Sequence, residues 1–206
     1  MTWSRAVVFA ALTATAGAAQ AWGLGARIGT TGVGADFGFD IAPTLGGRIG
    51  VSGGSFSTDF STDDVSYDAK VKMANLALLL DWSPLGPFRI TGGIVPNNNK
   101  IDLNGQVSNN GGSVTGSVEP AKSAAPYLGI GYGNVWTKGV NFYFDLGVMF
   151  QGSPQVSLSA TCNPGLGAAQ CAAIQSNVEA ERQRVQNELE KYKYYPVANI
   201  GITIGF

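Results

Sequence analysis

The 206-residue chain contains no histidine. This excludes catalysis by a histidine base and zinc bound through histidine. Charged residues are also scarce and make up 13% of the chain, about half of the roughly 25% usual in soluble domains. The 13 Lys and Arg nearly balance the 14 Asp and Glu, so we expect no nucleic-acid partner. The 45% of hydrophobic residues argues against a disordered chain.

Long hydrophobic runs are missing after the N-terminus. Residues 1–21 begin with a basic residue, Arg5, continue with the apolar stretch 6–16 and end in Ala-Gln-Ala at 19–21. This is the layout of a cleaved signal peptide. The apolar stretch is shorter than the roughly 20 residues that a spanning helix needs. We therefore expect residues 1–21 to be a signal peptide and 22–206 to be one exported domain.

Cysteine occurs only twice, at Cys162 and Cys171. In an oxidising compartment two cysteines this close are expected to form a disulfide that closes a short loop. Two thiols without histidine are too few ligands for a metal site. The sequence therefore predicts a disulfide and no metal.

The chain is rich in glycine, with 29 residues, and in segments where apolar and polar residues alternate with period two. In segment 198–206 the even positions are apolar, and the odd positions are small or polar. Such a pattern predicts a strand with one apolar and one polar face. Eight segments follow it: 24–28, 33–41, 45–52, 76–82, 88–94, 128–132, 140–150 and 198–206.

The predicted fold class is all-β: an eight-stranded antiparallel up-and-down transmembrane β-barrel. The small, polar and charged face suits a narrow lumen, and the apolar face suits lipid. Aromatic residues near segment ends, at Trp22, Trp82, Tyr132 and Phe206, are typical of the girdles at a membrane interface. A soluble β-barrel is the alternative, since its strands alternate as well.

The connections between the segments also favour a membrane barrel, in which periplasmic turns are short and extracellular loops longer. If the N-terminus is periplasmic, the periplasmic connections are all short and the long ones are all extracellular, and the short outer connection at 30–32 is the one exception. The short connections are 42–44, 83–87 and 134–139, and the long ones are 56–68, 102–124 and 152–194. The second long connection contains a hairpin-turn signal, Asn-Asn-Gly-Gly at 109–112, so the strands beside it would project beyond the bilayer; a flexible loop is the alternative.

The last long connection, 152–194, contains a segment with a different period. Ile174, Val178, Val185, Leu189 and Tyr192 form one stripe at helical spacing, which predicts a helix over about 172–192. Two roles stay open for this helix. It packs as a cap on the barrel rim or neighbouring loops, or it docks an extracellular or neighbouring membrane partner.

Seven charged residues fall on the face predicted to line the lumen. Because isolated buried charge is costly, these side chains should pair with one another. We expect a structural network that closes the barrel; the alternative is the selectivity lining of a narrow pore. No nucleophile signature accompanies the charges, so we predict no catalytic residue and no cofactor. The seven are Arg27, Asp36, Asp40, Arg48, Asp81, Arg89 and Asp145.

Two lysines share a face with the apolar residues of segment 76–82. Lys70 and Lys72 have the parity of Leu76, Leu78 and Leu80 and precede them toward the outer rim. At that position they would meet lipopolysaccharide phosphates or simply be solvated.

Three segments carry a further signal: LLLDWSP at 78–84, APYLGIGYGN at 125–134 and DLGVMFQGSP at 145–154. With them the chain resembles small bacterial outer-membrane barrels of the OmpA, OmpX and OmpW kind, and more narrowly a group of proteobacterial outer-membrane proteins. The resemblance implies the outer membrane of a Gram-negative bacterium, contact with outer-membrane lipid and lipopolysaccharide, and insertion by the barrel-assembly machinery. It brings no established activity or site.

The chain end fits the same resemblance. The alternating end with Ile202, Ile204 and Phe206 resembles the C-terminal assembly signal of such barrels. The enzymatic outer-membrane barrels depend on histidine, so none of their catalytic residues carries over. We expect a non-enzymatic protein with an envelope and surface-presentation role. The alternatives are a narrow pore for small solutes, or an adhesin or receptor acting through the 155–194 loop.

Overall fold

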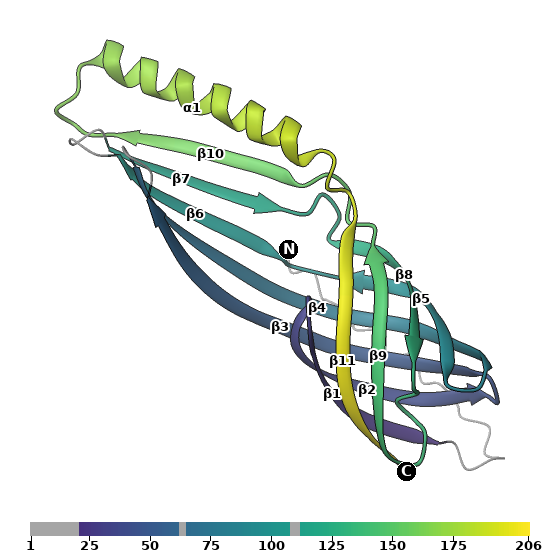
Figure 1. The fold of residues 1–206 in the computed structure, drawn as a ribbon. Coiled ribbons are helices and arrows are strands. Elements are labelled where there is room, and N and C mark those ends of the chain that lie inside the picture. The colour runs from purple at the N-terminus through teal and green to yellow at the C-terminus, as the bar shows by residue number, and fades with distance from the viewer. Residues whose placement is uncertain (1–20, 62–64, 108–111) are drawn as a thin grey trace, which may run out of the picture.

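The computed structural model describes residues 21–61, 65–107 and 112–206 (Figure 1). Residues 1–20 of the predicted signal peptide lie outside this part of the chain. Strands and one helix make up most of the described residues. They are β1 (Trp22–Gly29), β2 (Gly32–Ala42), β3 (Leu45–Ser61), β4 (Val65–Leu85), β5 (Phe88–Pro96), β6 (Lys100–Val107), β7 (Gly112–Glu119), β8 (Ala124–Tyr132), β9 (Gly139–Met149), β10 (Gln155–Cys162), α1 (Ala168–Leu189) and β11 (Tyr195–Gly205).

Eight of these strands form a closed antiparallel ring in the order β1, β2, β3, β4, β5, β8, β9 and β11. The ring closes where β11 pairs with β1, from Gly23 opposite Gly205 to Gly29 opposite Asn199. Closure removes the free sheet edges that lipid cannot satisfy. The prediction of an eight-stranded antiparallel barrel is therefore confirmed, and the eight predicted segments are the eight ring strands.

A second sheet region rises from one side of the ring (Figure 1). The C-terminal part of β4 pairs with β5, and this pairing ends at Leu78 opposite Ile94. The N-terminal part of β4 pairs with β6, from Val65 opposite Val107 to Lys72 opposite Lys100. β7 and then β10 add to β6. We call this region the wall: β3 and β4 beyond the paired Gly53 and Ala74, together with β6, β7, β10 and α1.

The wall shows that the three long connections consist largely of strands, and the pairing of β6 with β7 agrees with the hairpin expected in 102–124. Connections 56–68 and 102–124 are largely the β3–β4 and β6–β7 hairpins, and 152–194 contains β10 as well as α1. β10 was not predicted. The short connections stand as predicted at the opposite end of the ring, which we call the turn end.

α1 begins four residues earlier and ends three residues earlier than the predicted 172–192. It lies along β10, where the Gln186 amide donates to the Pro154 carbonyl at 2.9 Å and accepts from the Val156 N–H at 2.9 Å. Ile174 and Val178 are half-buried on this side, whereas Tyr192 lies beyond the helix end and is exposed. The helix thus covers the outer edge of β10, which would otherwise invite pairing with another chain.

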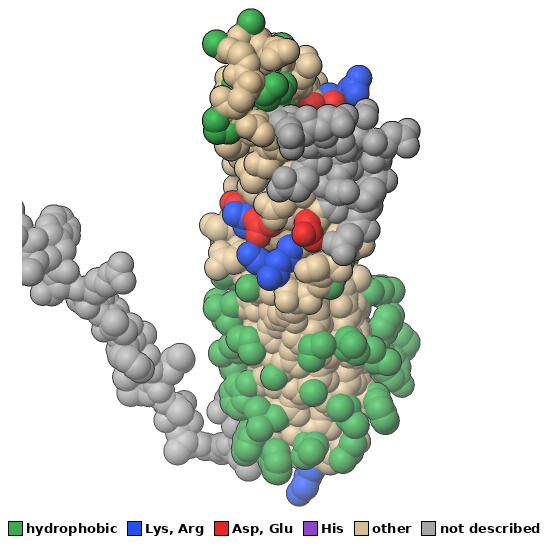
Figure 2. Space-filling view, turned by 90° about the vertical axis from the view of Figure 1, so that its left-hand side faces the viewer, with side chains coloured by type: hydrophobic (Ala, Val, Ile, Leu, Met, Phe, Trp, Pro, Cys, Tyr) green, Lys and Arg blue, Asp and Glu red, His purple; other side chains and the backbone are tan. Residues whose placement is uncertain are grey.

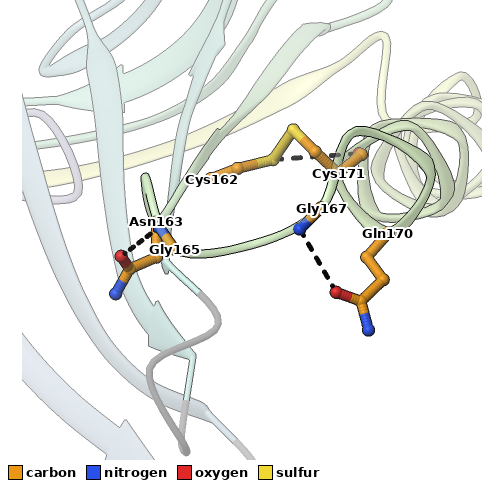
Figure 3. Close-up of a disulfide and its surroundings, with 6 residues drawn as sticks. All are labelled: Cys162, Asn163, Gly165, Gly167, Gln170 and Cys171. Carbon is orange, nitrogen blue, oxygen red and sulfur yellow. Dashed lines mark hydrogen bonds between the residues drawn. A yellow bond between two sulfur atoms is a disulfide. The ribbon is translucent and has the colours of Figure 1, made fainter.

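The predicted disulfide is confirmed. Figure 3 shows it joining Cys162, the last residue of β10, to Cys171 in the first turns of α1. The bond fixes the helix start beside the strand that the helix covers. No helix within the described ranges is long and apolar enough to cross a membrane.

The outer face of the ring is apolar. Figure 2 shows hydrophobic side chains gathered around the lower half of the molecule. Aromatic pairs lie at the two borders of this belt: Trp22 stacks on Phe206 at the turn end, with ring centroids 4.5 Å apart, and Phe150 meets Tyr194 near the wall at 5.6 Å. Such borders are typical of membrane interfaces.

The wall has the opposite pattern, which two neighbouring cross-strand rows illustrate. The outward row begins on the face of β4 that carries the exposed Leu76 and Leu78. The inward row begins on the face that carries the buried Ala77 and Leu79. The outward row is Lys70, Asp102, Ser117 and Ser157, and the inward row is Val71, Ile101, Val118 and Val156. Three of the inward residues, Val71, Ile101 and Val118, line a pocket of about 270 Å³ together with Leu189, so the end of α1 lies over the inner face.

Candidate functional site

Four of the predicted lumen charges form a closed ion-pair network inside the ring. Arg48 on β3 contacts Asp145 on β9 at 2.6 Å and Asp81 on β4 at 3.0 Å. Arg89 on β5 contacts the same two carboxylates, at 2.5 Å to Asp145 and 3.6 Å to Asp81. All four side chains are at most 3% exposed. Two cations and two anions from four strands therefore neutralise one another across the lumen.

A second buried pair lies beside this network. Arg27 on β1 contacts Asp36 on β2 at 2.8 Å, and the Tyr143 hydroxyl donates a short hydrogen bond to the other Asp36 oxygen. The Tyr143 ring lies between the two groups, with its centroid 5.7 Å from the Arg48 guanidinium and 5.5 Å from that of Arg89. The two-residue period of segment 140–150 puts Tyr143 on the same face as Asp145, but nothing in the sequence indicates that it connects the two ion-pair groups.

Asp40 is the remaining predicted lumen charge. It is only half-buried, near the turn-end terminus of β2, and its backbone N–H donates to the Ala21 carbonyl. The structure thus separates it from the six charges at the lumen centre. The parity of a residue in a strand predicts whether its side chain faces the lumen, but it does not predict how far along the barrel axis the side chain lies.

Glycine provides the space for these side chains. A β-carbon on Gly50 would lie 2.1 Å from a carboxylate oxygen of Asp36, and one on Gly131 would lie 2.8 Å from the guanidinium of Arg89. No side chain fits at either position without displacing an ion pair. The high glycine content is therefore, in part, room for the network in a narrow barrel.

The turn end of the lumen is filled by a connection rather than by a strand. Residues 133–138 join β8 to β9, and Val135 and Trp136 from this turn point into the barrel and are buried with Tyr143. The Trp136 ring lies against Gly46, where an added β-carbon would approach it to 2.3 Å. The sequence predicted only a short turn here, and the apolar Val-Trp pair was the one signal of a plug.

An apolar layer lies on the other side of the ion pairs, toward the wall. Its members pack together inside the ring, so the predicted narrow polar lumen also contains an apolar cluster. Between this layer and the charges lies a cavity of about 20 Å³, which has room for about one water molecule. The layer consists of Ala77, Leu79, Val95, Ala125, Tyr127, Met149 and Val197.

The lumen is thus a packed interior that contains the Val135–Trp136 plug, the charge network and the apolar layer. Buried polar side chains also line it beside the apolar layer: Thr31, Ser52, Asn75 and Asn199. Its three arginines are each held by carboxylates. Within the described part of the chain, no group of His, Cys, Asp and Glu side chains is arranged to hold a metal ion. The arrangement of side chains can stabilise a closed barrel, and it forms no recognisable nucleophile and base.

The C-terminal residues lie on the outer surface. Ile202 and Ile204 of β11 face outward and are about half exposed, and Phe206 stacks on Trp22. Their side chains are accessible from the lipid side of the barrel.

No protein-family model and no curated protein matches the chain. Solved structures do: the chain superposes on the crystal structure of CarO from Acinetobacter baumannii with a TM-score of 0.62 at 23% identity, over 89% of this chain and 97% of that one. It superposes on the crystal structure of CarO2 from the same organism with a TM-score of 0.62 at 21% identity, over 90% and 98% of the two chains.

These similarities concern the fold. They agree with the ring closure and the apolar belt, and the class of the protein is an eight-stranded transmembrane β-barrel. The narrower likeness to OmpA, OmpX and OmpW remains a resemblance between short segments.

Proposed function

We propose that the protein is a closed, non-enzymatic β-barrel of the outer membrane of a Gram-negative bacterium, and that the barrel anchors the wall on the cell surface. The observation that carries this proposal is the filled lumen, in which the plug, the ion pairs and the apolar layer succeed one another. A stable pore would instead need a continuous polar path.

The orientation follows from the two ends of the barrel. Short turns are typical of the periplasmic side and long connections of the extracellular side. The turn end, with the C-terminal Phe206, then faces the periplasm, and the wall stands outside the cell. In this orientation, the accessible Ile202, Ile204 and Phe206 are available to the barrel-assembly machinery during insertion.

The non-enzymatic part of the proposal rests on chemistry. The chain has no histidine, and the buried aspartates are engaged by arginines that do not release protons at physiological pH. An electrophile would find no activated nucleophile within this network.

Two measurements test the closed barrel. Folded protein should migrate faster than boiled protein on a gel, and planar bilayers containing it should show no steady conductance. Trp136→Ala removes the largest side chain of the plug, so this variant is the one most prone to conduct and is measured beside the wild type. Steady conductance by the wild type that changes when Arg48 or Arg89 is substituted would establish the pore alternative. A fully soluble, detergent-independent monomer would refute the barrel in the membrane.

Surface recognition is a second candidate, and the disulfide-fastened α1 favours it. The wall displays α1 and β10 at the end of the molecule opposite the turn end of the ring (Figure 1), as an adhesin or receptor requires. Replacement of residues 155–194 by a short linker should then abolish binding to host cells or to a neighbouring membrane protein while the gel shift persists. Unchanged binding would reject this candidate.

A further inference from the structure

The outward face of β4 changes character where the ring gives way to the wall. Leu80, Leu78 and Leu76 are exposed on the apolar belt, and the same face continues through Ala74 to Lys72 and Lys70. Adjacent residues on a strand are about 3.3 Å apart, so Lys72 lies roughly 13 Å beyond Leu76 along a tilted strand. If the belt marks the hydrocarbon core, the two lysines lie at the level of the lipid headgroups.

Lys70 and Lys72 belong to a groove on this outward face. The groove has a volume of about 440 Å³, and Lys100 and Asp102 of β6 line it together with hydroxyl groups of β7 and β10. Three ammonium groups face one carboxylate in its lining. We call it the lysine groove. Figure 2 shows a cluster of acidic and basic side chains directly above the hydrophobic belt.

The groove is only partly neutralised by its own carboxylates. Lys72 contacts Asp102 at 2.7 Å, and Lys100 contacts Asp102 at 3.3 Å and Glu119, at the margin, at 3.0 Å. Lys70 has no carboxylate within ion-pair distance among the residues that the structure describes. The lysines remain accessible, since the side chains of Lys72 and Lys100 are 50% and 40% exposed.

We propose that the lysine groove binds the phosphate groups of lipopolysaccharide in the outer leaflet around the barrel. This inference rests on the proposed outer-membrane location and names a lipid partner there. An anionic group at headgroup height meets three cations and several hydroxyl donors, and phosphate makes strong charge-assisted hydrogen bonds to such groups. The outward row of the wall contains no apolar side chain, so an acyl chain would find no complementary surface there.

Asp102 provides a specific test of the proposal, because its carboxylate competes with phosphate for Lys72 and Lys100. Removing its charge in Asp102→Asn should tighten lipopolysaccharide binding, whereas Lys70→Gln and Lys72→Gln should weaken it. A basic residue near a lipid surface contributes about fivefold to binding, so the double lysine variant should lose more than tenfold in affinity. Lys138→Gln, in the turn at the opposite end of the barrel, is the matched control with the same charge change.

The experiment uses the full chain folded in detergent, titrated with lipopolysaccharide and with its enzymatically dephosphorylated form, with bound lipid counted by native mass spectrometry. We expect the wild type and Lys138→Gln to bind the phosphorylated form alike, and the dephosphorylated form weakly. Equal binding by all variants, or equal binding of both lipid forms, would overturn the proposal. Saturation by inorganic phosphate alone would overturn the assignment to lipid.

A separate measurement distinguishes this inference from the proposed function. Insertion of each variant into bilayers and its gel shift are recorded first. Failure of the wild type to insert contradicts the proposed membrane location. Normal insertion with unchanged lipid binding in the lysine variants contradicts only the lysine groove.

Discussion

The barrel and the wall are built from continuous strands but arranged with opposite polarity. Along β4, inward residues of the barrel include the buried charge Asp81, and outward residues such as Leu78 are apolar. In the wall, the inward residues include Val71, and the outward residues are Lys70 and Lys72. A single strand thus exchanges the roles of its two faces within a few residues.

The difference shows that the surroundings of each region, more than the backbone, determine which side chains face outward. Lipid accepts apolar side chains and forces the charges of the barrel inward, where they must pair. In the wall, the outer face carries polar and charged side chains, and α1 packs over part of the inner one. The wall therefore buries apolar residues as soluble proteins do.

The largest expected effect comes from breaking the inner polarity of the barrel. Arg48→Met leaves Asp81 and Asp145 with Arg89 as their remaining arginine partner, and removal of one member of a buried ion pair costs about 3–5 kcal/mol. Urea titration of the protein folded into vesicles, followed by tryptophan fluorescence, measures the loss. Arg184→Met on the exposed surface of α1 is the control and should change little. Equal stability of both variants would show that the network is not structural.

The next largest effect is expected from substitutions on the outward face of β4, one in the barrel and one in the wall. Leu78→Lys places a charge in the lipid belt and should destabilise the inserted barrel by about 2–4 kcal/mol if this position is near the bilayer midplane. The reciprocal Lys72→Leu, six residues away on the same face, should leave barrel stability almost unchanged because this position lies in the wall. The same vesicle titration measures both. A similar cost for the two substitutions would contradict a boundary at Ala74.

Removal of the disulfide should weaken the wall and spare the barrel. In Cys162→Ser combined with Cys171→Ser, the unfolded wall gains the entropy of a roughly ten-residue loop, worth about 2–3 kcal/mol. We expect faster tryptic cleavage within α1 and an unchanged gel shift. Reduced wild type should behave like the double variant. Loss of the gel shift would mean that the two regions fold as one unit.

The smallest effect is acid weakening of the wall. The hydrogen bond from Lys72, together with that from Lys100, lowers the pKa of Asp102. Because the unfolded chain takes up this proton at a higher pH, the stabilisation is present above the ordinary carboxyl pKa and is lost as pH falls through the lowered one. The carboxyl carbon shift of Asp102, followed by NMR, measures its titration. Lys72→Gln should move the pKa back upward, and titration of the wild type in the ordinary carboxyl range would contradict the ion pair.

The ring strands were predictable because each carries a strict two-residue period over a face that meets lipid. The same reasoning placed Arg48, Asp81, Arg89 and Asp145 on one inner face. It did not predict which charges meet, because Arg48 and Asp145 are 97 residues apart and their contact depends on how the strands are staggered around the ring.

β10 was not predicted, for a different reason. Segment 155–162 alternates apolar and polar residues as the ring strands do, but it lies within a long connection, and its place in the sheet depends on pairing with β7. The Val135–Trp136 plug escaped because a short turn has no periodicity to show that it folds inward. A local pattern identifies the faces of a strand, but it does not identify the partner segment beside which the strand lies.

The sequence by itself determined the eight ring strands, their inward and outward faces, the helix and the cysteine pair, since alternation, helical spacing and loop length are local properties. The tertiary structure alone decided that β4 changes partners from β5 to β6, that Trp136 fills the turn end and that Tyr143 connects two ion-pair groups. These features depend on strand stagger and on the space that glycines such as Gly46 leave inside a narrow ring. Both arise only when distant segments close into a barrel.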